Sequence, residues 1–198
     1  TAQLAEQIVS DFRRTAAGRP PELHQAAGSS PMELSIMVST AEQLEAMRKT
    51  GCRRMLVPYG LPLLPEDIAV LPRISPPGFK QRLADLPARH VLVRNLGQLF
   101  LAKQCGKAIH TDFTLNCYNG FTAGLLAAYG AQTVTVSAEC TCAQIRAMRG
   151  IAPLEAVIYG RLPLMLTENC IKQAAVGCKQ AEQLQDRTGA QFPVRCLE

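Results

Sequence analysis

Short apolar runs separated by polar, helix-like segments dominate the chain from residue 33 onward. Each run ends in polar residues and is followed by a segment with helical spacing, and most of these segments end at a glycine. Continuous apolar runs of this length are typical of strands buried on both faces, and helices between them indicate a parallel sheet. The predicted strands are residues 34–38, 55–57, 68–71, 90–93, 108–112, 133–136, 156–159 and 164–166.

Eight strands that alternate with helices favour a closed (β/α)8-type barrel. The repeating part of the chain, however, is shorter than the ~250 residues typical of that fold. The connections at residues 59–66 and 160–163 are also too short for a crossover helix. We therefore predict an α/β fold whose parallel β/α units form a reduced or distorted TIM-like barrel, with an open parallel sheet as the alternative.

The segments outside this repeat suggest three domains. Residues 1–32 are predicted to be an N-terminal amphipathic helix and a linker rich in glycine and proline. Residues 33–169 are predicted to be the barrel-like domain, and residues 170–198 a cysteine-containing C-terminal segment that we expect to be truncated. Within the barrel-like domain, Ser39 and Glu42 predict a capping box for a helix that ends at Gly51.

Composition and charge limit the class of protein. The chain is 47% hydrophobic and 19% charged, as expected of a globular domain, and has no apolar run near the ~18 residues of a membrane span. Its net charge of +5 mildly favours binding to polyanionic partners. Eight cysteines without a signal segment indicate reduced thiols and a cytoplasmic protein. Because the chain begins at Thr1, we expect a piece of a longer protein.

Polar residues follow the predicted strands at the edge where parallel α/β folds bind ligands. They are Tyr59, Arg73, Asn95, Asp112, Asn116, Asn119, Ser137, Glu139 and Arg161. Arginines bind carboxylates or phosphates with paired hydrogen bonds, and amides orient such a ligand, so the set predicts a small anionic substrate. The alternative for Asn95, Asn116 and Ser137 is helix capping.

Cysteine and histidine are the other residue types that could bind a metal ion or act in catalysis. Cys170, Cys178 and Cys196 are spaced neither like a zinc site nor like a ferredoxin motif. His110 lies within a predicted strand and is interpreted as a packed core residue rather than a base. The sequence has neither the His-Glu-x-x-His motif of zinc peptidases nor the Gly-x-Ser-x-Gly motif of serine hydrolases.

Three blocks, residues 111–119, 130–139 and 155–165, resemble the collagenase-like peptidases of family U32, specifically the second barrel-like part of the longer bacterial members. The resemblance extends over residues 33–196. Some members are regarded as proteases. Others resemble enzymes that hydroxylate RNA bases or ubiquinone precursors without oxygen, using a [4Fe–4S] cluster and, for RNA, prephenate as the hydroxyl source.

The resemblance implies roles for particular residues. Cys170, Cys178 and Cys196 match the first three cluster ligands, and the fourth would lie beyond Glu198. Zinc, or no metal, is the alternative at these thiolates. Arg161 stands where the shorter members have a cysteine soon after the glycine.

Prephenate is a dicarboxylate, and the predicted strand-end residues suit it. Arg73 and Arg161 would bind its carboxylates, with Asn116 and Asn119 as further substrate contacts. The catalytic candidates are Glu139 and Asp112, which would orient the substrate or move a proton.

Three functional hypotheses remain open. In the first hypothesis, the chain is part of an iron–sulfur-dependent enzyme that hydroxylates RNA bases, and the isolated fragment is inactive. The second is a metal-dependent peptidase, and the third a non-catalytic scaffold or RNA-binding module. The expected partners are the remaining domains of a longer chain, a small anionic substrate such as prephenate and, in the first and third hypotheses, RNA, with no membrane.

Overall fold

The computed structural model describes residues 32–167, 169 and 183–194, and the chain divides into two compact units, Thr1–Ile158 and Tyr159–Glu198. The helix and linker predicted for residues 1–32 lie outside the described residues, apart from Met32. Most of the predicted segment 170–198 lies outside them as well. The predicted division into three domains therefore stays a prediction.

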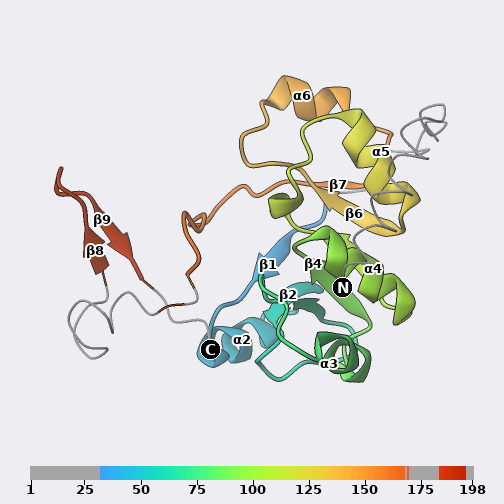
Figure 1. Cartoon of the computed structure of the whole chain (residues 1–198), viewed down its shortest axis with the longest axis horizontal. Coiled ribbons are helices and arrows are strands. Elements are labelled where there is room, and N and C mark those ends of the chain that lie inside the picture. The colour runs from blue at the N-terminus through green and yellow to red at the C-terminus, as the bar shows by residue number, and fades with distance from the viewer. Residues whose placement is uncertain (1–31, 168, 170–182, 195–198) are drawn as a thin grey trace. The chain divides into compact units, whose positions relative to one another are not determined.

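The first unit is built on one seven-stranded parallel sheet (Figure 1). Its strands are β1 (Ser35–Met37), β2 (Arg54–Pro58), β3 (Ile68–Val70), β4 (His90–Val93), β5 (Ala108–Thr111), β6 (Ala131–Thr135) and β7 (Leu154–Glu155). The strands neighbour one another in the order of the sequence, which is the order of a barrel rather than of a doubly wound sheet. The sheet is curled into a half-barrel, which confirms the predicted reduced barrel of parallel β/α units.

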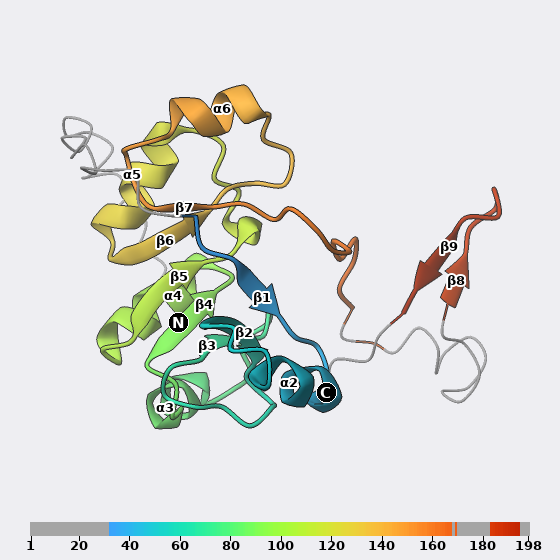
Figure 2. The same ribbon diagram turned by 180° about the vertical axis from the view of Figure 1, so that it is seen from behind.

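Five helices and one short 3-10 helix connect the strands. They are α2 (Ala41–Arg48), α3 (Phe79–Asp85), α4 (Leu96–Gln104), η1 (Phe113–Leu115), α5 (Gly120–Ala128) and α6 (Cys142–Ala147). Both ribbon views place α5 and α6 beside β6 and β7, and α2 and α3 at the opposite end of the sheet (Figures 1 and 2). The connection between β2 and β3 contains no helix, as its length predicted. No described helix is long and apolar enough to cross a membrane.

The strands bury side chains on both faces, which explains why their sequences are almost continuously apolar. Alternate strand residues, such as Val91 and Val93, pack with α3, α4 and α5 in the main core. On the opposite, inner face, a separate cluster contains Leu56, Ile68, Val70 and Leu92. The parallel register places Leu56 beside Ile68 and Val70 beside Leu92.

The ends of the helices follow the sequence prediction in part. The four glycines predicted to end helices all have a positive φ, namely Gly51, Gly106, Gly130 and Gly150. The capping box predicted for Ser39 and Glu42 is wrong by one residue. Thr40 is the N-cap of α2 and accepts from the backbone N–H of Gln43, whose side chain accepts from the backbone of Ser39.

The last two predicted strands are wrong. Strand β7 is Leu154–Glu155, and neither residues 156–159 nor 164–166 form a strand. Leu154 and Glu155 pair with the last two residues of β6, so among the described residues no strand lies beside the chain where it continues. Ile158 is 82% exposed and Leu164 is 79% exposed. An apolar sequence predicts burial, but these residues would be buried only beside a neighbouring strand, which the described sheet does not supply there.

The second unit contains an antiparallel hairpin of β8 (Gln183–Gln185) and β9 (Gln191–Pro193). A carboxylate oxygen of Asp186 accepts from the backbone of Thr188 at 2.8 Å and of Ala190 at 2.9 Å, and it also accepts from the Thr188 hydroxyl. These hydrogen bonds, above all the one from the Thr188 side chain, hold the pKa of Asp186 below its ordinary value. The carboxylate therefore organises the turn.

Candidate anion-binding site at the strand ends

Three charged side chains follow consecutive strands of the sheet. Arg73 comes three residues after β3, Arg94 comes directly after β4, and Asp112 comes directly after β5. The strand ladder continues into this edge, because Leu71 donates to the carbonyl of Leu92 and Asp112 to that of Val93. The parallel register therefore brings the three residues to one edge of the half-barrel. We call Arg73, Arg94 and Asp112 the rim cluster.

Arg94 and Asp112 form a mostly buried ion pair. Their Nε and Oδ2 atoms are 3.2 Å apart, and the side chains are 17% and 4% exposed. Burial raises the pKa of the Asp112 carboxyl, although the charge of Arg94 and hydrogen bonds from Phe113 and Thr114 oppose this shift. Burial likewise lowers the pKa of the Arg94 guanidinium, while Asp112 opposes the shift. The pair is therefore held in an environment that penalises charge on either partner.

The rim cluster carries one more positive than negative charge. Arg73 is close enough to lower the pKa of both Asp112 and Arg94 through its charge. Nε of Arg94 has no hydrogen-bond partner with good geometry among the described residues. Within that same part of the chain, no hydrogen bond or ion pair engages the guanidinium of Arg73. The oxygens of a carboxylate or phosphate ligand could accept hydrogen bonds from these guanidinium groups.

Four of the other strand-end residues make contacts of their own or end an element within the first unit. Asn95 is the N-cap of α4 and Asn119 that of α5. Asn116 has a left-handed backbone with φ 50° and ends η1. Glu139 is exposed and accepts a 2.7 Å hydrogen bond from the Tyr118 hydroxyl. The capping alternative holds for Asn95, and none of these contacts tests a role in binding or catalysis.

Arg161 belongs to the second unit and is exposed. The structure does not fix that unit relative to the rim cluster, so the predicted pairing of Arg161 with Arg73 stays a prediction. Cys170, Cys178 and Cys196 lie outside the described residues. Among the residues that are described, no group of three His, Cys, Asp or Glu side chains is arranged to hold a metal ion.

Replacing Asn119 tests whether that residue is a cap or a substrate contact. Its Oδ1 accepts from the backbone of Thr122 at 2.9 Å at the start of α5. Asn119→Ala is expected to lower the free energy of unfolding by about 1 kcal/mol, whereas Asn119→Asp should be nearly neutral because Asp also caps helices. Urea denaturation measures both changes. Equal stability of Asn119→Ala and wild type would contradict the capping role.

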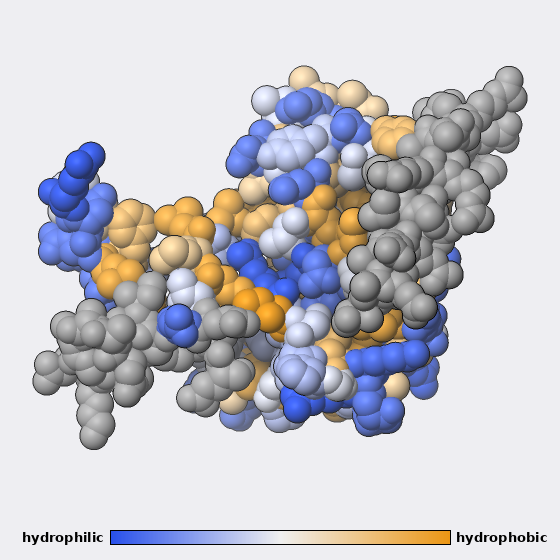
Figure 3. Space-filling view, viewed as in Figure 1, coloured by the Kyte–Doolittle hydropathy of each residue, from blue (hydrophilic) through white to orange (hydrophobic). Residues whose placement is uncertain are grey.

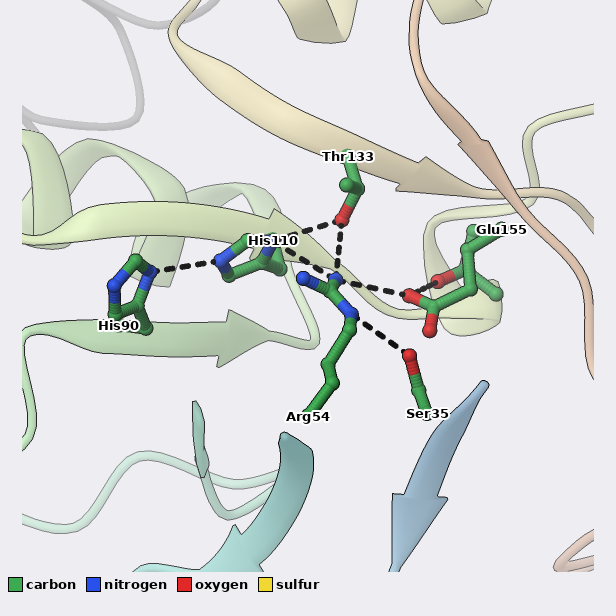
Figure 4. Close-up of polar contacts among 7 residues, drawn as sticks. Ser35, Arg54, His90, His110, Thr133 and Glu155 are labelled. Carbon is green, nitrogen blue, oxygen red and sulfur yellow. Dashed lines mark hydrogen bonds and ion pairs between the residues drawn. The ribbon is translucent and has the colours of Figure 1, made fainter. Parts of the chain in front are cut away.

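A second polar cluster lies on the inner face of the sheet (Figure 4). We call it the inner-face cluster, and it consists of Ser35, Arg54, His90, His110, Thr133, Thr135 and Glu155. Arg54 is its centre. Its guanidinium donates to Ser35 at 2.7 Å and to Thr133 at 3.1 Å, and lies 3.5 Å from a carboxylate oxygen of Glu155.

The contact between Arg54 and Glu155 shows that the sheet is strongly curved. Arg54 begins β2 and Glu155 ends β7, and four strands lie between them. Neighbouring strands are ~4.8 Å apart, so β2 and β7 would be ~24 Å apart in a flat sheet. An arginine and a glutamate cannot span that distance. The sheet must curl until its inner face brings the two strands opposite each other, and the ion pair holds this curl.

The tautomer of His110 follows from its hydrogen-bond partners. Nδ1 of His110 lies 2.8 Å from the Thr133 hydroxyl and 3.3 Å from a guanidinium nitrogen of Arg54. Because the guanidinium can only donate, Nδ1 accepts. Neutral His110 therefore carries its proton on Nε2 and donates to Nδ1 of His90, 3.1 Å away. Burial, with the charges of Arg54 and His90, lowers the pKa of His110 to about 3. His110 is thus a neutral core histidine, as interpreted from the sequence.

Sequence reasoning missed Arg94 and the inner-face cluster for different reasons. Arg94 directly follows a predicted strand, so the rule that selected Arg73 would also have selected it. Arg54 and Glu155 are 101 positions apart (155 − 54), and no local pattern links them.

On the face shown in Figure 3, hydrophilic residues gather at the centre of the first unit and hydrophobic residues border them.

Comparison with known proteins identifies the family. The model of peptidase family U32 matches residues 78–185, which is more than half of the chain. The chain belongs to peptidase family U32. No curated protein and no solved structure matches it. The matched range of this U32 chain includes Arg94 and Asp112 of the rim cluster, and begins after Arg73.

Proposed function

We propose that this U32 chain is the substrate-binding part of an iron–sulfur-dependent enzyme that hydroxylates RNA bases. In this proposal the rim cluster binds a small dicarboxylate such as prephenate. Family membership supports the general assignment. The observation that carries the proposal is the excess positive charge of Arg73 and Arg94 at the carboxyl ends of β3 and β4, where parallel α/β folds bind ligands.

The rim cluster offers chemistry suited to a carboxylate ligand. A guanidinium presents paired N–H donors that match the two oxygens of a carboxylate. The terminal nitrogens of Arg94 are not hydrogen-bonded within the described part of the chain, because its contact with Asp112 is made through Nε. Asp112 can therefore keep Arg94 in place while the ligand binds the outer edge of the same guanidinium.

Asp112 and Glu139 are the proposed proton-handling groups. Burial raises the pKa of the Asp112 carboxyl above its ordinary value, which favours a carboxyl that can take up and release a proton. Glu139 is exposed and bonded to Tyr118. Asn116, Asn119 and Arg161 are proposed as further substrate contacts.

The proposed cofactor is a [4Fe–4S] cluster. The cluster would be held by Cys170, Cys178 and Cys196. Cysteine thiolates are the usual ligands of such clusters, so these residues are of the right chemical type. A bound cluster would supply single electrons at low potential. A fourth ligand would come from the remaining domains of a longer chain.

The presence of the cluster is tested on the full-length protein purified without oxygen. We expect a brown protein with about four irons and an equal amount of sulfide. Replacing Cys170, Cys178 and Cys196 by Ser should abolish the colour and the iron. The matched control replaces Cys52, Cys105 and Cys142 by Ser, and it should keep both.

Other outcomes would point to the other hypotheses. A colourless protein that binds zinc and cleaves gelatin in a chelator-sensitive way would contradict the proposal and favour a peptidase. A metal-free protein that binds RNA with a strong salt dependence would favour a non-catalytic RNA-binding module.

A further inference from the structure

Three helices of the sheet unit carry a glutamine at the same position of their first turn. They are Gln43 in α2, Gln98 in α4 and Gln144 in α6. In each case the side-chain oxygen accepts a 2.8 Å hydrogen bond from a backbone N–H at or just before the N-cap, donated by Ser39, Arg94 and Thr141 respectively. This is the capping-box type of contact, and it closes the start of a helix.

Gln98 differs from the other two in what else it contacts. It is completely buried, whereas Gln43 and Gln144 are exposed. Its amide nitrogen donates to the carbonyl of Pro72 at 2.6 Å and to the hydroxyl of Ser75 at 3.1 Å. Both acceptors lie in the connection that follows β3. Gln98 therefore links the start of α4 to a loop from a different strand.

The linked segments are those that carry the two arginines of the rim cluster. Gln98 accepts from the backbone of Arg94 itself, and Pro72 directly precedes Arg73. Asn95 strengthens the link, because its amide donates to the carbonyl of Arg73 at 3.3 Å while its oxygen accepts from the backbone of Gln98. The first turn of α4 thus holds the backbones of both arginines.

We propose that Gln98 is a positioning residue that sets the spacing of Arg73 and Arg94, and thereby selects ligands with two carboxylates over ligands with one. The inference rests on the anion site of the proposed function. A single carboxylate needs only one guanidinium, so its binding does not depend on the spacing. A dicarboxylate gains its second charge-assisted contact only when both guanidiniums are held at a fixed separation.

The test is to titrate acetate and malonate, a mono- and a dicarboxylate, into the full 198-residue chain and follow binding by NMR. Wild type is expected to bind malonate about tenfold more tightly than acetate, from one additional charge-assisted contact. Gln98→Leu should bind acetate as wild type does but lose the preference, with the two affinities within about twofold. Gln43→Leu and Gln144→Leu, the matched controls, should keep it.

Three results separate the failure of this inference from that of the anion site. If wild type binds neither malonate nor acetate, the anion site of the proposed function is wrong, and the inference about Gln98 is wrong with it. If wild type binds the two acids equally, the anion site stands and the inference about the spacing of the arginines is wrong. If Gln98→Leu keeps the preference, Gln98 is only structural and the anion site stands. Should Gln98→Leu not fold, Gln98→Met replaces it. Methionine adds no charge to the anion site, is at most a weak acceptor for Arg94 and cannot donate to Pro72, so the same loss of preference is expected.

Discussion

Replacing Arg54 by methionine is expected to lower the free energy of unfolding by about 3–5 kcal/mol. Arg54 is mostly buried in the inner-face cluster, where it donates to Ser35 and Thr133 and pairs with Glu155. Its removal leaves the carboxylate of Glu155, which is 20% exposed, without its cation. An unpaired charge in such a place is costly, because the protein cannot solvate it as water would.

The stability of Arg54→Met is measured by urea denaturation beside three further variants, namely Arg53→Met, Glu155→Leu and the double variant of Arg54 and Glu155. Arg53→Met is the matched control, because Arg53 is the exposed neighbour of Arg54, and its change should stay within about 0.5 kcal/mol. The double variant Arg54→Met/Glu155→Leu removes both charges and should recover most of the loss. A double variant that is as unstable as the sum of the two single variants would show that the pair is not coupled.

Stability is also expected to fall on acidification because of His110. Its pKa is lowered from 6.5 to about 3 in the folded chain, whereas the unfolded chain keeps the ordinary value. Between these values the unfolded state binds a proton that the folded state does not, so acid favours unfolding. Between these two pKa values the free energy of unfolding falls by about 1.4 kcal/mol for each pH unit. The stability is therefore fully present above pH 6.5 and is lost progressively as the pH falls toward 3.

The pH effect is isolated by comparing wild type with His110→Gln. A glutamine amide can still accept from Arg54 and donate to His90, but it does not titrate. Denaturation at pH 7, 6, 5 and 4 should give a smaller loss of stability with acid in the variant. Identical slopes in the two proteins would mean that the pKa of His110 is not lowered in the folded chain, which would contradict the neutral, buried His110 described above.

The arrangement of the sheet followed from local sequence signals. Alternation of apolar runs with helical segments gave six of the seven strands, from β1 to β6, and the glycines that end the helices. Such signals are local, because strand burial and helix ends depend on a few adjacent residues. The strand prediction was wrong where the burial of an apolar segment depended on a neighbouring strand. Residues 156–159 are as apolar as a strand but have no neighbouring strand to pair with.

The candidate site was predicted less completely than the fold. Reading the residues after each strand found Arg73 and Asp112 but passed over Arg94, although Arg94 provides the ion pair with Asp112. Family resemblance pointed to U32, which the family model confirms. The roles of Cys170, Cys178 and Cys196 stay predictions, because these residues lie outside the described part of the chain.

The sequence by itself determined the parallel β/α order, the family and the edge at which charged residues gather, since each depends on local pattern. Only the tertiary structure decided which charges meet. The curl of the half-barrel brings Arg54 to Glu155 across four strands, and one buried glutamine, Gln98, ties the loops of Arg73 and Arg94 together. Such contacts depend on the distance between segments far apart in the chain, and no local pattern encodes that distance.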